Sequence, residues 1–279
     1  MESGKRKIIF LDIDGTLTEP GTNVIPESAL KAVRGAQAKG NYVFLCTGRN
    51  YDMLSPLLQY GFDGLIGSSG GYIESAGKAI YDCPMTEEQR VRAMNVLQEH
   101  GVFRTVECKD GSYTDEGFKD FLRNHAEEGG NSELLRWREQ IEKSLRILPM
   151  EQYQGQPIYK IVIMCENEKQ LEVPRRVLAD DFHFCIQAPD KFGFTNGEVV
   201  NRKFHKGKGV ERVCEYLQIP VEDTVAFGDS MNDLEMMETA GLSICMANGS
   251  EPLKKLADDI CPSVKEDGIY QAFEKYRLM

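Results

Sequence analysis

The stretch Ile8-Ile9-Phe10-Leu11-Asp12-Ile13-Asp14-Gly15-Thr16 decides the fold of this chain. Its apolar part has the length and composition of a buried parallel strand. Asp12 and Asp14 follow at the carboxyl end of that strand, where open α/β sheets bind their ligands. Carboxylates are costly to bury unless they are paired or bound to a cation. The stretch therefore indicates a Mg²⁺ site with a carboxylate that is free to do chemistry.

Strand and helix patterns alternate near both ends of the chain. This alternation is typical of the α/β class, with a doubly wound, Rossmann-like parallel sheet. The expected strands after the first are 42–46, 65–66, 224–227 and 242–246. The expected helices lie after Pro26, from 53 to 58, after Lys206, from 234 to 237 and from 253 to 257.

The middle of the chain has a different pattern, typical of a separate α+β unit. Thr86 and Gln89 are spaced as a capping box at the start of one helix, and 133–147 reads as another. Residues 158–164 and 182–186 are expected strands. We therefore predict a core formed by 1–82 and 199–279, interrupted by an inserted α+β domain at 83–198.

Composition narrows the functional class. The 279 residues are 41% hydrophobic and 28% charged, with a formal net charge of −11. Proteins that bind nucleic acid are usually basic, so we expect no nucleic acid partner. No apolar run approaches the roughly 20 residues of a membrane helix, so we expect no membrane partner. A small phosphorylated substrate remains compatible with the acidity, because a metal and a few cations can meet its charge locally.

Cysteine usage bears on the compartment. The chain has 8 cysteines, none in a Cys-x-x-Cys pair, and several lie inside apolar runs. This distribution is typical of free thiols in a reducing environment. The first seven residues, Met1-Glu2-Ser3-Gly4-Lys5-Arg6-Lys7, are polar and lack the apolar region of a secretory signal. We expect a cytoplasmic protein, as a monomer or a small homo-oligomer.

Three further motifs accompany Asp12-x-Asp14 at predicted loop positions. They are Thr47-Gly48-Arg49, Lys206 ahead of a helix, and Gly228-Asp229-Ser230-Met231-Asn232-Asp233. The carboxyl ends of parallel strands share one edge of the sheet, so residues that are far apart in the sequence can meet there.

This set of residue types suits the cleavage of a phosphate ester. Such a reaction needs a nucleophile, neutralisation of the phosphoryl oxygens and a proton for the leaving oxygen. Asp12 and Asp229 supply carboxylates for Mg²⁺, Lys206 supplies a positive charge, and Thr47 supplies a hydroxyl. Asp14 is expected within reach of the same site, where it could move a proton.

These motifs, in this order, resemble those of the haloacid dehalogenase superfamily of aspartyl-phosphate phosphohydrolases. The string at 228–233 and the later Met246-Ala247-Asn248-Gly249 are similar to the Cof-type sugar-phosphatase branch. That branch carries a large cap domain, which the insertion at 83–198 matches in position and size. The resemblance implies a Mg²⁺-dependent phosphatase for a small phosphorylated metabolite, such as a sugar phosphate, with specificity set by the cap.

The resemblance also implies a role for individual residues. Asp12 would be the nucleophile, and Asp14 the general acid and then the general base. Thr47, Gly48 and Lys206 would bind the transferring phosphoryl group. The Mg²⁺ ligands would be Asp12, the backbone carbonyl of Asp14, and Asp229, with Asp233 supporting them. Arg49 is either a structural salt-bridge residue or a site residue, and Asn232 is a further candidate. Asn248 either caps the following helix or serves near the site, and Ser69-Gly70 stands where relatives commonly have Asn-Gly.

Two alternatives stay open. A phosphotransferase or mutase that passes the phosphoryl group to a sugar hydroxyl would carry the same core motifs. A sensor that binds Mg²⁺ and a phosphate ligand without turnover is disfavoured, because it has no need for both Asp12 and Asp14. An EF-hand is excluded, because Gly15 stands at the fourth position of the loop where that motif needs glycine at the sixth.

Overall fold

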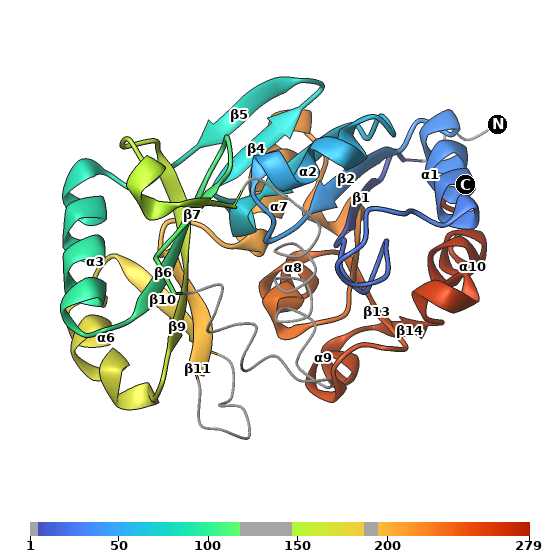
Figure 1. Ribbon diagram of the computed structural model, residues 1–279. Coiled ribbons are helices and arrows are strands. Elements are labelled where there is room, and N and C mark those ends of the chain that lie inside the picture. The colour runs from blue at the N-terminus through green and yellow to red at the C-terminus, as the bar shows by residue number, and fades with distance from the viewer. Residues whose placement is uncertain (1–4, 118–146, 187–194) are drawn as a thin grey trace. The chain divides into compact units, whose positions relative to one another are not determined.

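The computed structural model describes residues 5–117, 147–186 and 195–279, which are drawn in colour in Figure 1. The chain divides into two compact units. The first comprises Met1–Arg49, Ser55–Asp82 and His205–Met279, and the second comprises Asn50–Leu54 and Cys83–Phe204. The predicted helix at 133–147 falls, apart from Ile147, outside the described residues.

The first unit is built on one eight-stranded sheet, in the order β14-β13-β12-β1-β2-β3-β4-β5. Neighbours from β14 to β3 run parallel, which confirms the predicted α/β class. The sequence did not reveal that β4 and β5 extend the sheet as an antiparallel pair. The strands are β1 (Ile8–Leu11), β2 (Tyr42–Cys46), β3 (Gly64–Gly67), β4 (Tyr72–Ser75), β5 (Lys78–Asp82), β12 (Thr224–Gly228), β13 (Leu242–Met246) and β14 (Asp259–Cys261).

Strand β1 lies inside this sheet, between β2 and β12. All four of its residues are buried, as the apolar sequence predicts. Ile8 is registered with Tyr42 on one side and Thr224 on the other. Beyond the strand, the Asp12 N–H donates to the Phe227 carbonyl at 3.0 Å. The backbone of Asp12 is therefore anchored to β12 at the carboxyl edge of the sheet.

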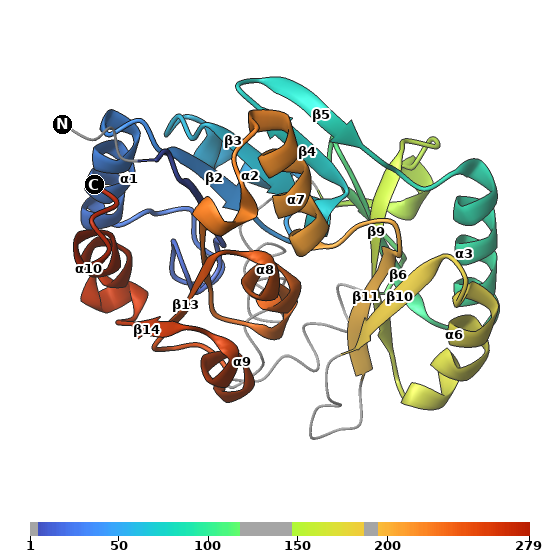
Figure 2. The ribbon, with the colours of Figure 1, turned by 180° about the vertical axis from the view of Figure 1, so that it is seen from behind.

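Helices cover both faces of this sheet (Figure 2). Buried residues of α7, α8 and α9 form one apolar cluster with Phe10, Phe44 and Ala226. On the opposite face, Phe227 of β12 packs on Phe273 of α10, with ring centroids 5.5 Å apart. The helices of this unit are α1 (Glu27–Ala38), α7 (Lys206–Leu217), α8 (Leu234–Thr239), α9 (Glu251–Leu256) and α10 (Gly268–Lys275), and α2 (Tyr51–Leu58) has residues in both units.

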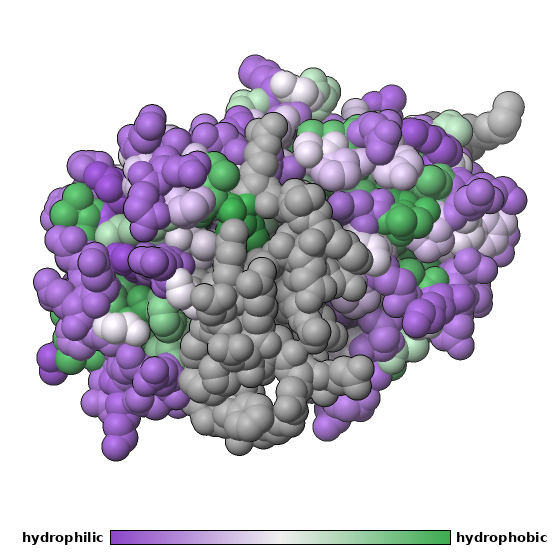
Figure 3. Space-filling model, in the orientation of Figure 1, coloured by the Kyte–Doolittle hydropathy of each residue, from purple (hydrophilic) through white to green (hydrophobic). Residues whose placement is uncertain are grey.

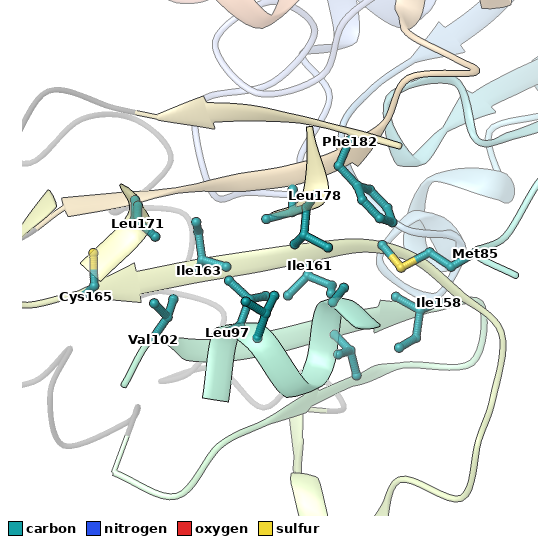
Figure 4. Close-up of a cluster of buried hydrophobic side chains, with 14 of the residues drawn as sticks. Met85, Leu97, Val102, Ile158, Ile161, Ile163, Cys165, Leu171, Leu178 and Phe182 are labelled. Carbon is teal, nitrogen blue, oxygen red and sulfur yellow. The ribbon is translucent and has the colours of Figure 1, made fainter. Parts of the chain in front are cut away.

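The second unit has a six-stranded sheet in the order β10-β11-β9-β6-β7-β8. Helix α3 starts with the predicted capping box of Thr86 and Gln89. The core of the second unit includes Leu97 of α3, Leu178 of α6, and Ile161 and Ile163 of β9 (Figure 4). The elements are α3 (Glu87–Glu99), β6 (Phe103–Cys108), β7 (Ser112–Thr114), β8 (Ile147–Pro149), β9 (Ile158–Cys165), α6 (Glu172–Leu178), β10 (Phe182–Ile186) and β11 (Thr195–Asn201).

The described surface on the face seen in Figure 3 is mainly hydrophilic, and its apolar residues lie in small separate groups. Within the described ranges, no helix has both the length and the apolar character that crossing a bilayer requires.

Candidate active site

Three carboxylates converge at the carboxyl edge of the first unit's sheet. Asp12 follows β1, Asp229 follows the neighbouring strand β12, and Asp233 ends the short 3₁₀ turn Met231–Asp233. One oxygen from each lies within 4.8 Å of the others. All three are buried, with exposed fractions of 4%, 7% and 0%. The sequence prediction that Asp12 and Asp229 meet at this edge is therefore confirmed.

Lys206 lies in the same cluster, although it comes from the start of α7. Its Nζ is 2.7 Å from Asp12 Oδ1 and 2.5 Å from Asp233 Oδ1. The side chain is 1% exposed, so both ion pairs are shielded from water. The preceding residue, His205, is the N-cap of α7 and accepts a hydrogen bond from the Lys208 N–H through Nδ1 at 3.3 Å. The ammonium therefore bridges the nucleophile candidate and the carboxylate of the 3₁₀ turn.

Asp233 also holds the loop after β12 in place. Its Oδ2 accepts hydrogen bonds from the Asp229 N–H at 3.0 Å and the Ser230 N–H at 3.2 Å. Asn232 lies beside the cluster, with Oδ1 3.4 Å from the Nζ of Lys206. The segment from Gly228 to Asp233 thus folds so that the Asp233 carboxylate fixes the backbone of Asp229.

Burial and mutual repulsion destabilise the ionised forms of the carboxylates in this cluster. Desolvation, followed by the charge of Asp233, raises the pKa of Asp12 to about 7 although Lys206 opposes the shift. Desolvation and the charges of Asp12 and Asp233 raise the pKa of Asp229 to about 9. Burial alone would lower the pKa of Lys206, but the two neighbouring carboxylates hold it well above its usual value. A further cation would favour the charged forms of these carboxylates.

The residues present fit a hard divalent cation. Carboxylate oxygens are the ligands that Mg²⁺ takes, usually together with water and substrate oxygen. Gly15 lets the loop after β1 approach Asp229 closely. Its φ is +85°, and a Cβ there would lie 2.4 Å from Asp229 Oδ2. Buried carboxylates with close backbone approach form the donor set that such an ion requires.

Asp14 lies near this cluster in sequence, but its carboxylate is held by Arg49. Arg49 Nε donates to Asp14 Oδ2 at 2.8 Å, and Nη2 donates to Oδ1 at 2.7 Å. Arg49 is 2% exposed and also contacts the Thr22 carbonyl and Asn23 Oδ1. The Gly21 N–H adds a third hydrogen bond to Asp14, at 2.9 Å. This bidentate pair fixes both oxygens of the carboxylate.

Thr47 and Gly48 lie where β2 ends. The backbone N–H of Thr47 donates to the Ile66 carbonyl at 2.8 Å, which ties this loop to β3. The hydroxyl of Thr47 accepts from the Arg49 N–H at 3.1 Å, and Thr47 is 1% exposed. Gly48 lies between these two residues, so one short loop carries the threonine and the arginine that holds Asp14.

Two further residues contact this site, Thr16, for which no role was predicted, and Asn248, for which two roles were left open. The Thr16 hydroxyl donates to Asp229 Oδ1 at 3.4 Å. Asn248 Nδ2 donates to the Gly15 carbonyl at 2.8 Å, whereas the N-cap of α9 is Ser250. The capping interpretation of Asn248 is therefore wrong. The position of Asn248 directly after β13 was the available signal, because loops at that edge share one site.

The sequence matches a known family of hydrolases. The sequence model of the haloacid dehalogenase-like hydrolase family matches residues 9–273. The Bacillus subtilis protein YkrA is 28% identical over 277 residues, covering 98% of each chain. Phosphatase YwpJ of the same organism is 27% identical over 282 residues, covering 94% of this chain and 97% of its own.

Solved structures agree on the fold. The sugar phosphatase BT4131, of subclass IIB of that superfamily, superposes with a TM-score of 0.75 at 24% identity. The match covers 98% of this chain and 100% of BT4131. The chain therefore belongs to the haloacid dehalogenase-like hydrolase family.

Proposed function

We propose that the enzyme hydrolyses a small phosphorylated metabolite with Mg²⁺, through a phosphoryl group carried transiently on Asp12. The observation that carries this proposal is the meeting of Asp12, Asp229 and Asp233 within 4.8 Å, with Lys206 bound to two of them. The family assignment supplies the reaction class, and the geometry supports these residues as the ones that perform it.

Asp12, Asp229 and the backbone carbonyl of Asp14 are the groups that we propose hold Mg²⁺, with Asp233 orienting Asp229. When bound, the ion neutralises charge on the phosphoryl oxygens and keeps two anions, the Asp12 carboxylate and the substrate, close together. The fit of the donor set supports this assignment. Carboxylates that repel one another when alone are compatible once a divalent cation lies between them.

The proposed reaction has two displacements at phosphorus. An Asp12 oxygen attacks first, the bond from phosphorus to the ester oxygen breaks, and Asp14 gives its proton to the leaving alcohol. A water then gives a proton to Asp14 and attacks the same phosphorus. The bond from phosphorus to Asp12 breaks, which releases inorganic phosphate and restores the carboxylate.

Arg49 affects how Asp14 can take part in the reaction. It donates hydrogen bonds to both oxygens of Asp14, so this pair must open before Asp14 can give a proton to the leaving oxygen. The deprotonated form is the one that accepts a proton from water. We propose that Asp14 turns from Arg49 toward the leaving oxygen for the first displacement and returns to the deprotonated state afterwards.

Thr47, Gly48 and Lys206 are proposed to bind the phosphoryl group. Lys206 supplies a buried positive charge at 2.7 Å from the attacking carboxylate, so it neutralises repulsion between Asp12 and an incoming phosphate. Thr47 offers a hydroxyl hydrogen, since its oxygen is already an acceptor for the Arg49 N–H. The Gly48 backbone allows close approach without a side chain.

The second unit is proposed to act as the cap that selects the substrate. Most of this unit, Cys83–Phe204, is inserted in the sequence between two segments of the first unit, as expected for a cap domain. Because BT4131 is named a sugar phosphatase, sugar phosphates are the first class of substrate to examine. The chain has eight cysteines and no Cys-x-x-Cys pair, a pattern typical of a reducing environment, so we propose that the enzyme works in the cytoplasm.

A phosphate-release screen over sugar phosphates, nucleotides and cofactor phosphates tests the proposal, with and without Mg²⁺. We expect release that depends on Mg²⁺ and needs no added acceptor alcohol. Rapid acid quench followed by peptide mass analysis should locate one phosphoryl group on the peptide that contains Asp12. Release that requires an added sugar would instead indicate a phosphotransferase, and binding without turnover of any compound would indicate a sensor.

A further inference from the structure

The loop that follows β13 contacts both of the loops that carry the acidic cluster. Asn248 Nδ2 donates to the Gly15 carbonyl at 2.8 Å, in the loop after β1. The Ser250 N–H donates to the Asp229 carbonyl at 2.8 Å, in the loop after β12. Strand β13 pairs with β12 and not with β1, so the Asn248 side chain reaches across one intervening strand.

Gly15 is the point at which a small displacement would matter most. A Cβ on Gly15 would lie 2.4 Å from Asp229 Oδ2, so this backbone and that carboxylate are already in close contact. The next residue, Thr16, points its hydroxyl at Asp229 Oδ1 from 3.4 Å. The hydrogen bond from Asn248 restrains the Gly15–Thr16 peptide. It thereby fixes the distance between the loop after β1 and Asp229.

The loop after β13 is itself restrained. The Gly249 N–H donates to the Met246 carbonyl at 2.8 Å, and a Cβ on Gly249 would lie 2.6 Å from Cys245 Sγ and 2.9 Å from the Asp229 carbonyl. Asn248 is exposed although its neighbour Gly249 is buried. An exposed side chain on a restrained loop contributes little to the core, so its hydrogen bond to Gly15 is what it adds to the structure.

We infer that Asn248 is a positioning residue for the metal site. It fixes the loop of Asp12 and Asp14 against the loop of Asp229, and so sets the spacing of the carboxylates that would share Mg²⁺. This inference rests on the proposed function, because it concerns the ion that the proposed reaction uses. Partners that orient metal ligands typically change metal affinity by about 10- to 100-fold when they are removed.

The test is Asn248→Ala, with Mg²⁺ binding to the substrate-free protein measured by isothermal titration calorimetry. We expect the Mg²⁺ dissociation constant to rise about tenfold. The midpoint of thermal unfolding without Mg²⁺ should stay close to that of the wild type, because the side chain is exposed. Asn248→Gln keeps the amide donor and should recover part of the lost affinity.

Asn41→Ala is the matched control. Asn41 Nδ2 donates to the Leu278 carbonyl at 2.8 Å, which is the same kind of bond in the same unit, and its Oδ1 accepts from the Lys7 N–H. Asn41→Ala should lower the unfolding midpoint and leave the Mg²⁺ affinity unchanged. Wild-type affinity in Asn248→Ala, or an equal loss in Asn41→Ala, would overturn the inference.

The same titration separates this inference from the proposed function. If the wild type binds no Mg²⁺, the metal requirement of the proposed reaction fails and the inference falls with it. If the wild type binds Mg²⁺ and Asn248→Ala binds it equally well, only the inference fails. If Asn248→Ala binds weakly while the wild type hydrolyses no phosphate ester, the inference stands and the proposed reaction fails.

Discussion

Each unit of this molecule buries a lysine among carboxylates. The two clusters differ in the elements that carry them and in the number of carboxylates around the lysine. In the first unit, Lys206 faces Asp12 and Asp233 where strands end, with Asp229 as a third carboxylate. In the second unit, Lys160 lies within β9, with Nζ 2.5 Å from Glu198 Oε1 and 3.3 Å from Glu107 Oε2.

The comparison shows that a buried lysine–carboxylate cluster does not by itself indicate a catalytic site. Lys160 and Glu107 are registered opposite each other on adjacent strands, and both are fully buried. Among the residues that the structure describes, the three carboxylates close enough to share a metal ion lie in the first unit. The first unit instead gathers an excess of acids on loops that approach one another closely. We therefore expect the first cluster to govern activity and the second to govern stability.

The largest effect is expected for Asp12→Asn. Replacing the attacking oxygen with an amide removes the nucleophile, and losses of this type reach roughly 10⁴-fold in kcat. Steady-state phosphate release on the best substrate measures it. Glu107→Gln, the matched change in the second cluster, should leave kcat within a few-fold of the wild type. A comparable loss of kcat in both variants would break the distinction between the clusters.

The next effect concerns Lys160→Met. Removing this ammonium leaves Glu107 and Glu198 buried without their cation, and breaking such a pair typically costs about 3–5 kcal/mol in the free energy of unfolding. Urea or thermal unfolding followed by circular dichroism measures the change. Adding Glu107→Gln and Glu198→Gln to the same chain should recover much of the stability, because no buried charge then remains unpaired. A single variant as stable as the wild type would contradict this interpretation.

Metal removal should have a smaller effect on stability, confined to the first unit. Mg²⁺ at 100 times its dissociation constant should stabilise the folded protein by about 2.7 kcal/mol, because it binds the folded state alone. Differential scanning calorimetry with Mg²⁺ and with a chelator measures this shift. Asp229→Asn should abolish the shift, whereas Glu198→Gln should retain it. A shift that survives Asp229→Asn would place the ion elsewhere.

The smallest expected effect is on the pH dependence of stability, through the helix that carries Lys206. Lys206 begins a helix that His205 caps as a hydrogen-bond acceptor, and burial lowers the pKa of His205 in the folded protein. A lowered histidine pKa gives stability that is present above the unfolded value of 6.5 and is lost as the pH falls below it. His205→Asn keeps a capping acceptor without this titration. The unfolding midpoint of the wild type should therefore fall more than that of His205→Asn between pH 7 and pH 5.

The alternation of strands and helices and the order of the motifs sufficed to predict the α/β core and the meeting of Asp12 with Asp229. These features follow from local patterns and from the shared edge of a parallel sheet. The antiparallel pair of β4 and β5 was not predicted, because no rule of alternation requires it. The ion pair of Arg49 with Asp14 depends on the conformation of the loop at 19–23, which the sequence pattern does not specify.

The second cluster shows a different limit of sequence reasoning. Lys160 lies in an apolar run that correctly predicts a strand, yet a lysine in such a run gives no indication of its partners. Glu107 and Glu198 come from strands that are far away in the sequence, and their pairing with β9 is a matter of register. Register is set by the packing of the whole sheet, so local patterns could not identify this triad.

The two outer strands of the first sheet have a consequence for how this protein behaves in concentrated solution. Strand β5 carries the exposed charges of Lys78 and Asp82, and β14 spans only Asp259–Cys261. Charges and short length on a border strand oppose the docking of a strand from another molecule. The border strands of this sheet therefore oppose aggregation through strand pairing between molecules. Substitutions that make β5 apolar should reduce the yield of monodisperse protein.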